Sequence, residues 1–188
     1  MHRQHLIELL ARYERVHPEE RELVHRFHRF ASEHDDCLLR SCVPGHITAS
    51  AWIVSRDGSR CLLTHHRKLD RWLQLGGHVD GESRIEEAAR REAVEESGFG
   101  EVELLLPRGW LVPLDLDVHP IPARGTEPEH LHWDVRFLFR VGGDTDVPVV
   151  SEESHDVKWF TAAELHGVTD EESVLRLHRK ASVLLGGA

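Results

Sequence analysis

The spacing of apolar residues changes along the chain, and this change restricts the fold to one that combines helices with a sheet. Residues 1–35 carry apolar side chains at helical spacing in two stripes, which predicts two amphipathic helices. Over residues 46–54 the period becomes two, which predicts a strand. Asp57-Gly58 and a second apolar run at 61–64 then predict a β-hairpin, because Asp-Gly favours the tight turns that join two strands.

The remaining segments add strands and helices in a mixed order. We expect a short strand over 72–75 that stops at Gly76-Gly77, a helix over 83–97 that opens with a Ser83–Glu86 capping box, strands over 102–106 and 110–116, a surface loop over 117–130, strands over 132–141 and 157–160, and a helix over 171–185. This order predicts an α+β protein or an α/β/α sandwich around a mixed sheet, rather than a doubly wound parallel sheet. A chain of 188 residues fits one domain.

The composition argues against several classes of partner. The formal net charge is −10 and the Lys and Arg residues are scattered, whereas proteins that bind nucleic-acid backbone usually carry a basic patch. We therefore expect no polynucleotide partner, although a free nucleotide stays open because one bound cation can neutralise a diphosphate. The three cysteines form no CxxC pair and no apolar run has membrane length, so we expect a cytoplasmic protein with no membrane partner.

The chain contains 16 histidines, which invites a metal-binding interpretation because imidazole is a common metal ligand. Most of them occur singly and are expected to lie on a solvated surface. His65-His66, His78 and the pair His130 and His132 stay as candidates for a functional role.

Three glutamates in the predicted helix over 83–97 carry the clearest chemical signal. Glu92, Glu95 and Glu96 are related by i, i+3 and i+4, so their side chains meet on one helix face. Carboxylates crowded in this way repel one another unless a cation lies among them, and hard oxygen ligands suit Mg²⁺ or Mn²⁺. A solvated helix face with weak ion pairs, such as Arg90-Arg91-Glu92, explains the same spacing and stays open at this point.

Two glycines precede this helix and add to the signal. Gly76 and Gly77 let the backbone turn tightly and approach a ligand closely, so that a carbonyl there can reach the same cation. The start of the helix also offers free N–H groups to an anion. Together, a cation, carboxylates and an anion site are what an attack on a phosphate requires.

The stretch from Gly76 to Phe99 resembles the Nudix box, the signature of the Nudix hydrolase superfamily. That pattern is a glycine, five residues, a glutamate, seven residues, Arg-Glu, an aliphatic residue, any residue, Glu-Glu, any residue, glycine and an aliphatic residue. Gly77 supplies the first glycine and residues 91–99 match the second half, with Ala93 and Phe99 as loose fits. The first glutamate departs from the pattern, because Glu82 arrives one position early, as a one-residue deletion between Asp80 and Gly81 would produce. The resemblance covers residues 45–165, which implies a Nudix core with a helical extension over 1–40 and a C-terminal helix over 170–186.

The resemblance also implies a role for individual residues. The implied metal ligands are the carbonyl of Gly77 and the carboxylates of Glu92, Glu95 and Glu96, with a further glutamate from a late loop, for which Glu153 is the candidate and Glu152 the runner-up. Glu95, Glu96, Glu153 and Arg91 are the catalytic candidates, Arg91 through a buttressing salt bridge, and Glu82 supports the ligands from behind. Trp72, His78 and His132 are candidates for substrate binding. Trp72 and Trp133 could stack on a nucleobase, but packing in the core or at its rim is the favoured explanation for each, and a structural hydrogen bond is favoured for each histidine alone. Asp134 stays outside the catalytic set.

The implied activity is that of a nucleotide pyrophosphohydrolase. It cleaves a phosphoanhydride bond in a nucleoside diphosphate linked to another moiety, using Mg²⁺ or Mn²⁺ to activate the attacking water and a glutamate to accept its proton. The expected partner is a small-molecule diphosphate, and a homodimer stays open. Two alternatives remain: a Nudix module that binds a nucleotide without turnover, and an enzyme similar to isopentenyl diphosphate isomerase. The box does not identify the substrate, because loops outside the box bind the part of the substrate that lies beyond the diphosphate.

Overall fold

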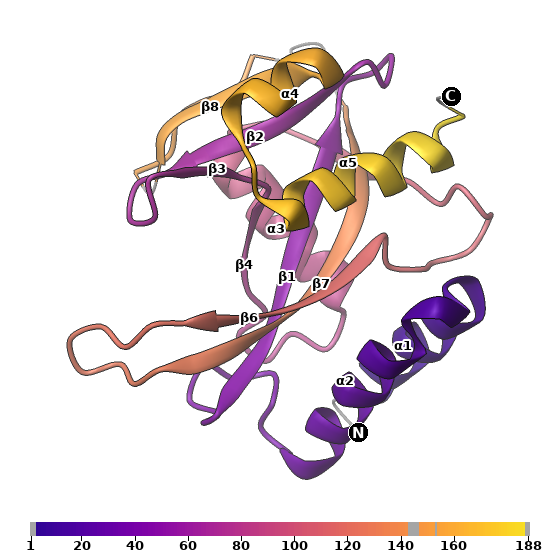
Figure 1. The fold of residues 1–188 in the computed structure, drawn as a ribbon, viewed down its shortest axis with the longest axis vertical. Coiled ribbons are helices and arrows are strands. Elements are labelled where there is room, and N and C mark those ends of the chain that lie inside the picture. Colours follow the sequence, from indigo (N-terminus) through magenta and orange to yellow (C-terminus); the bar gives the residue numbers. More distant parts are fainter. Residues whose placement is uncertain (1–2, 143–146, 153, 187–188) are drawn as a thin grey trace.

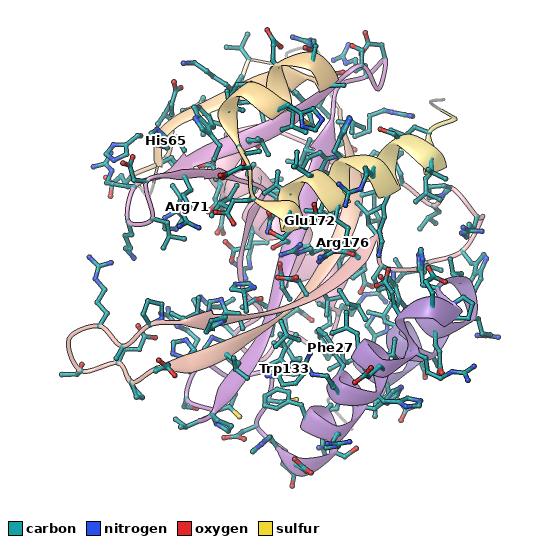
Figure 2. All side chains as sticks on the ribbon, in the orientation of Figure 1. Phe27, His65, Arg71, Trp133, Glu172 and Arg176 are labelled. Carbon is teal, nitrogen blue, oxygen red and sulfur yellow. The ribbon has the colours of Figure 1, made fainter. Side chains whose placement is uncertain are left out.

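The N-terminal segment forms two helices, as its apolar spacing predicts. In the computed structural model, which describes residues 3–142, 147–152 and 154–186, they are α1 (Gln4–Val16) and α2 (Arg21–Glu33), joined by the 3-10 turn η1 (Pro18–Glu20). The buried stripes are Leu6, Leu9, Leu10 and Tyr13 on α1, and Val24, Phe27, Phe30 and Ala31 on α2. Figure 1 shows the pair packed beside the sheet, and Figure 2 shows Phe27 next to Trp133, with ring centroids 5.1 Å apart.

The described strands form one mixed sheet, which confirms the predicted fold class. They are β1 (Gly45–Val54), β2 (Arg60–His66), β3 (Arg71–Leu73), β4 (Leu75–His78), β5 (Val102–Leu104), β6 (Asp115–Ile121), β7 (His130–Val141) and β8 (Ser154–Thr161). The main path runs β3-β2-β1-β7-β5, while β4 pairs with β1, β6 with β7 and β8 with β2. β1 and β7 run parallel, in a register that sets His46 beside His132 and Thr48 beside Asp134.

The central strand β1 separates two packing layers. Ile47, Ala49 and Ala51 face a core shared with α1, α2 and α3 (Ile85–Ser97). Trp52 and Val54 face a second core shared with α5 (Glu172–Leu184). In Figure 1, α5 lies in front of the sheet and α3 behind it. All of β1 is buried, because other elements pack on both of its faces.

The helices differ from the prediction at two points. α3 begins at Ile85, with Arg84 as a cap residue that makes no side-chain hydrogen bond, so the Ser83–Glu86 capping box is wrong. The reason is that Glu86 is buried and its Oε2 lies 2.6 Å from Nε2 of His5 in α1. A capping box forms instead between Thr161 and Glu164 at the start of α4 (Ala162–Val168), a helix that the sequence did not indicate. Within the described part of the chain, no helix combines the length and the apolar character that a membrane span requires.

Strand β6 corrects the prediction of a strand over 110–116 and a surface loop over 117–130. Residues 115–121 are a strand that pairs antiparallel with β7, opposite residues 130–136. Asp115, Asp117 and His119 alternate with Leu116 and Val118, which is the pattern of a strand with one polar face. Pro120 is tolerated because β6 pairs with β7 alone and lies at an edge.

Strand β4 corrects the prediction that the segment over 72–75 stops at the glycines. The chain breaks at Gln74 between β3 and β4, and Gly76 and Gly77 lie inside β4, paired with Ser50 and Ala49. A Cβ on Gly76 would lie 2.5 Å from Oγ of Ser50 and 2.6 Å from the carbonyl oxygen of Ala49. The glycine is therefore required by the close approach of β4 to β1.

A buried network of ion pairs joins β6, β7 and α5. The carboxylate of Asp115 is fully buried and lies 3.2 Å from Arg136, 2.8 Å from Arg176 and 2.7 Å from Lys180. Lys180 also donates to the hydroxyl of Tyr13 at 2.6 Å, which connects α5 to α1. Figure 2 shows Arg176 on the side of α5 that faces the sheet. The network therefore links the N-terminal helices to the sheet through charge as well as through apolar packing.

Candidate active site

The box helix α3 packs closely on the sheet because its buried face consists largely of small side chains. Ala88, Ala89 and Ala93 are buried against the core that contains β1. Gly98 then ends the helix in the left-handed conformation, with φ of 70°, as its position in the sequence predicts. This packing sets the glutamates of the helix next to the glycine backbone of β4.

Two of the three glutamates lie on the glycines of β4. A Cβ on Gly77 would lie 2.6 Å from Oε2 of Glu92, so the carboxylate occupies the space that any other residue would fill. Gly76 donates its backbone N–H to Oε2 of Glu96 at 3.1 Å. The structure thus brings Gly77, Glu92 and Glu96 together from segments that are separate in the sequence.

Arg91 holds this arrangement together. Its Nη1 donates to Oε1 of Glu92 at 2.6 Å and to Oε2 of Glu95 at 3.3 Å, and its Nη2 donates to the carbonyl of His78 at 2.8 Å. Burial disfavours the charged guanidinium, but the carboxylates of Glu92 and Glu95 outweigh it and raise the pKa of Arg91 above its usual value. The side chain therefore stays charged and bridges α3 to β4, which is the position that a buttressing role requires.

The loop between β4 and α3 positions Glu82 away from these contacts. Asp80 and Gly81 both have positive φ, and Gly81 donates its N–H to the carbonyl of Leu38 at 2.8 Å. Glu82 is exposed, and its Oε1 accepts the backbone N–H of Arg84 at 3.0 Å. Its carboxylate thus orders the entry to the helix, and its support of the metal ligands stays a prediction.

The candidates from the late loop are Glu153 and Glu152. Glu153 lies outside the described residues. Glu152, the runner-up, is exposed in a turn that precedes β8.

The tryptophans that were candidates for base stacking differ in their surroundings. Trp133 is buried and stacks on Phe30 at 4.4 Å between ring centroids, so it belongs to the core. Trp72 is partly buried on β3 and stacks on His65 at 5.0 Å, with Lys158 5.9 Å from its ring centroid. One face of Trp72 is thus occupied by a histidine, and a role in substrate binding stays a prediction.

The two histidines singled out as substrate-binding candidates, His78 and His132, lie close together, 5.3 Å apart between ring centroids. They share their surroundings with His46, which the sequence did not distinguish from the other histidines. Asp134 is buried and accepts hydrogen bonds from Thr48 at 3.1 Å and Ser50 at 2.8 Å, so it holds strands together.

Comparison with known proteins identifies the chain. The model of the family described as the NUDIX domain matches residues 44–179, which is most of the chain. The chain belongs to the Nudix family. The match spans β1 to α5, including the glutamates of α3.

Named relatives of this Nudix family member match part of its length. The chain is 34% identical over 104 residues to an RNA pyrophosphohydrolase of Caulobacter vibrioides, which is 52% of this chain and 59% of that protein. It is 27% identical over 113 residues to the NAD-capped RNA hydrolase NUDT12 of Macaca fascicularis, which is 58% of this chain and 21% of that protein. The chain therefore spans less than two thirds of either relative. A Nudix family hydrolase of Clostridium perfringens has the same fold, with a TM-score of 0.58 and 24% identity over 74% of this chain and 97% of that one.

The donor atoms of this Nudix site fit a hard divalent cation. The carboxylates of Glu92 and Glu96 lie beside the backbone of Gly77 and Gly76, and the missing side chain of Gly77 leaves room for the carboxylate of Glu92. Glu95 lies on the same helix face and is bound to Arg91. Carboxylate and carbonyl oxygens are the ligands that Mg²⁺ and Mn²⁺ prefer. Glu92, Glu95, Glu96 and the carbonyl of Gly77 would hold such an ion.

Proposed function

We propose that this Nudix hydrolase cleaves a phosphoanhydride bond in a nucleoside diphosphate linked to another moiety, with Mg²⁺ or Mn²⁺ as its cofactor. The observation that supports the proposal is the placement of the α3 carboxylates on the glycine backbone of β4, held by Arg91. When bound, the cation would neutralise the charge of the diphosphate and lower the pKa of a water molecule.

The side chains of Glu92 and Glu95 differ in how much of their surface solvent reaches, and this difference suggests different roles. The side chain of Glu92 is 15% exposed and bound to Arg91, whereas that of Glu95 is 60% exposed. Glu95 is thus the better placed of the two to meet a substrate from solvent. Arg91 fixes the direction of both carboxylates, and a glutamate, either Glu95 or Glu153, accepts the proton of the attacking water.

A substitution on α3 tests this proposal directly. Glu95→Gln and Glu96→Gln keep the size of the side chain and remove its charge, so we expect turnover to fall by at least ~10²-fold while the fold is kept. Glu87→Gln is the matched control, because Glu87 lies on the same helix and contacts Arg90 rather than the glycines. The assay is phosphate release from a panel of nucleoside triphosphates, dinucleotides, ADP-ribose and sugar nucleotides, with and without added pyrophosphatase. Turnover near that of the wild type in both variants would remove the glutamates from the mechanism.

A phosphorylated or capped RNA end is the second candidate substrate, and the names of the two relatives favour it. The net charge of −10 argues for a small nucleotide instead. A comparison of NAD with NAD-capped RNA, and of a nucleoside triphosphate with triphosphorylated RNA, separates the two. Faster cleavage of the RNA substrates at equal concentration would establish the RNA end as the substrate.

The same panel distinguishes the two remaining alternatives. Tight binding of ADP-ribose without turnover in Mg²⁺ would favour a module that binds nucleotides. Isomerisation of a prenyl diphosphate without release of phosphate would favour an isomerase.

A further inference from the structure

A cluster of histidines lies on the face of the sheet opposite the box helix. β1 contributes His46, β7 contributes His130 and His132, and β4 contributes His78. The parallel register sets His46 directly beside His132, and His130 lies on the same face because side chains alternate along a strand. His78 pairs with Thr48, two residues after His46, and so shares this face, whereas Gly77 faces α3.

The imidazole rings of this cluster are in mutual contact. The centroid of the His46 ring lies 4.9 Å from that of His78, 5.0 Å from that of His130 and 4.9 Å from that of His132. One ring nitrogen from each of His46, His130 and His132 lies within 4.8 Å of the others. Ligands around a tetrahedral Zn²⁺ with bonds of about 2.1 Å are separated by roughly 3.4 Å, so small side-chain rotations would bring these nitrogens to a common ion.

Several ring nitrogens in the cluster lack a hydrogen-bond partner. Both nitrogens of His46, which is 1% exposed, are buried without one, as are Nε2 of His130 and Nε2 of His132. Buried polar atoms are normally satisfied, and several orphaned nitrogens that face one another indicate a missing ligand that accepts lone pairs. Burial also lowers the pKa of His46 to about 4, so its lone pair is available at neutral pH.

One of these rings is already oriented as a ligand. Nδ1 of His130 lies 2.9 Å from the carbonyl oxygen of Pro128, an acceptor, so Nδ1 carries the proton and Nε2 carries the lone pair. A backbone carbonyl that fixes the tautomer in this way is typical of histidines that bind metals. Glu127 places its Oε1 4.0 Å from Nε2 of His130, so a carboxylate is near to offset the charge of an ion.

We propose that His46, His130 and His132 bind a divalent transition-metal ion such as Zn²⁺, at a site separate from the carboxylates of α3. Nitrogen ligands select such ions, whereas Mg²⁺ prefers oxygen. His132 is partly exposed, so solvent reaches the outer side of the cluster. The two sites lie on opposite faces of β4, with Gly77 at one and His78 beside the other, which gives the chain one cation site lined by oxygens and one lined by nitrogens.

Titration with Co²⁺ tests the proposal, because Co²⁺ bound by nitrogens in a tetrahedral site absorbs visible light far more strongly than Co²⁺ bound by oxygens. The full chain is stripped of metal and titrated in millimolar Mg²⁺, which occupies the carboxylate site. We expect one strongly absorbing Co²⁺ per chain, displaced by Zn²⁺. Binding should weaken at least ~10²-fold in His130→Gln and His132→Gln. The proposal would be overturned if the wild type showed no such spectrum, or if both variants bound Co²⁺ with the affinity of the wild type.

Two control variants separate this site from other histidines and from the hydrolase site. His166→Gln changes an exposed histidine on α4 and should bind Co²⁺ as the wild type does. Glu95→Gln should also keep the Co²⁺ spectrum even where turnover is lost, so the failure of one proposal is distinct from the failure of the other. Loss of the spectrum in either control would overturn the assignment to the cluster.

Thermal stability gives a second measurement that does not depend on the spectrum. His46→Leu removes two unpartnered nitrogens, so the metal-free variant should melt at or above the temperature of the wild type. Added Zn²⁺ should raise the melting temperature of the wild type, because an ion that binds the folded state stabilises it, and should raise that of the variant less. An equal rise in both would contradict the proposal.

Discussion

Replacement of Gly77 by alanine isolates the contact on which the proposed hydrolase site depends. The added Cβ would lie 2.6 Å from Oε2 and 2.7 Å from Cδ of Glu92, where ordinary contact begins at 3.4 Å. The carboxylate must therefore move by roughly 0.8 Å. Gly77 does not have positive φ, so alanine adds no backbone strain, and the displaced atoms are the end of a flexible side chain.

The expected effect falls on turnover rather than on folding. A misplacement of about 1 Å at a catalytic group costs on the order of 10²-fold in rate, so kcat/KM should fall by about 10²-fold in Gly77→Ala. The free energy of unfolding should change by less than about 1 kcal/mol, since nothing in the core is repacked. The concentration of Mg²⁺ required for half-maximal rate should rise if Glu92 is a ligand.

The measurement is kcat/KM across a range of Mg²⁺ concentrations, together with a urea unfolding curve. Gly100→Ala is the matched control, because a Cβ there would meet no atom within 4 Å. If Gly77→Ala keeps kcat/KM within about threefold of the control and the same dependence on Mg²⁺, then Glu92 does not act beside Gly77, and the reasoning fails.

Other predictions follow from the same structure. Activity should require Mg²⁺ or Mn²⁺ and disappear in EDTA, as hard oxygen ligands hold these ions weakly; full activity in the chelator would contradict the cofactor. Glu153→Gln should lower turnover by at least ~10²-fold if it is the general base, and by less, with partial rescue by excess metal, if it is a ligand only. Asp115→Asn should lower the free energy of unfolding by about 1–3 kcal/mol in urea titrations, because it removes the buried charge that Arg136, Arg176 and Lys180 share while their other carboxylate partners stay; an unchanged free energy would refute this. Burial alone would raise the pKa of Asp117, but the hydrogen bond with His119 and the charge of Arg136 hold it well below its usual value. Asp117 therefore stabilises the fold above pH ~4 and loses this effect as the pH falls further, so urea unfolding from pH 7 to pH 3 should show a shallower decline in Asp117→Asn.

The parts of the molecule that local spacing determines were predicted from the sequence. The spacing of Glu92, Glu95 and Glu96 follows from the geometry of one helix, and Gly98 ends that helix where expected. The strand predicted over 132–141 is β7, and it follows from local alternation. The hairpin at Gly58 follows from turn chemistry.

The parts that distant contacts determine were missed. β6 carries Asp115 and Asp117, whose charges are acceptable in a strand because Arg176 and Lys180 approach them from α5. The local sequence around Glu86 fits a capping box, but Glu86 is buried and contacts His5, which lies 81 positions away in the sequence. His46 is one of 16 histidines in the sequence, and the parallel pairing of β1 with β7 alone sets it beside His132.

The parallel pairing of β1 with β7 also affects how the chain folds as it leaves the ribosome. Thr48 and its partner Asp134 are 86 positions apart, so the central strand waits on the order of ten seconds for its neighbour at usual rates of synthesis. Tyr13 and Lys180 are 167 positions apart, so the N-terminal helices wait longer still for α5. Until then, β1 can pack only on α1, α2, α3 and β4, so the part of the core that β7 and α5 complete is exposed during synthesis.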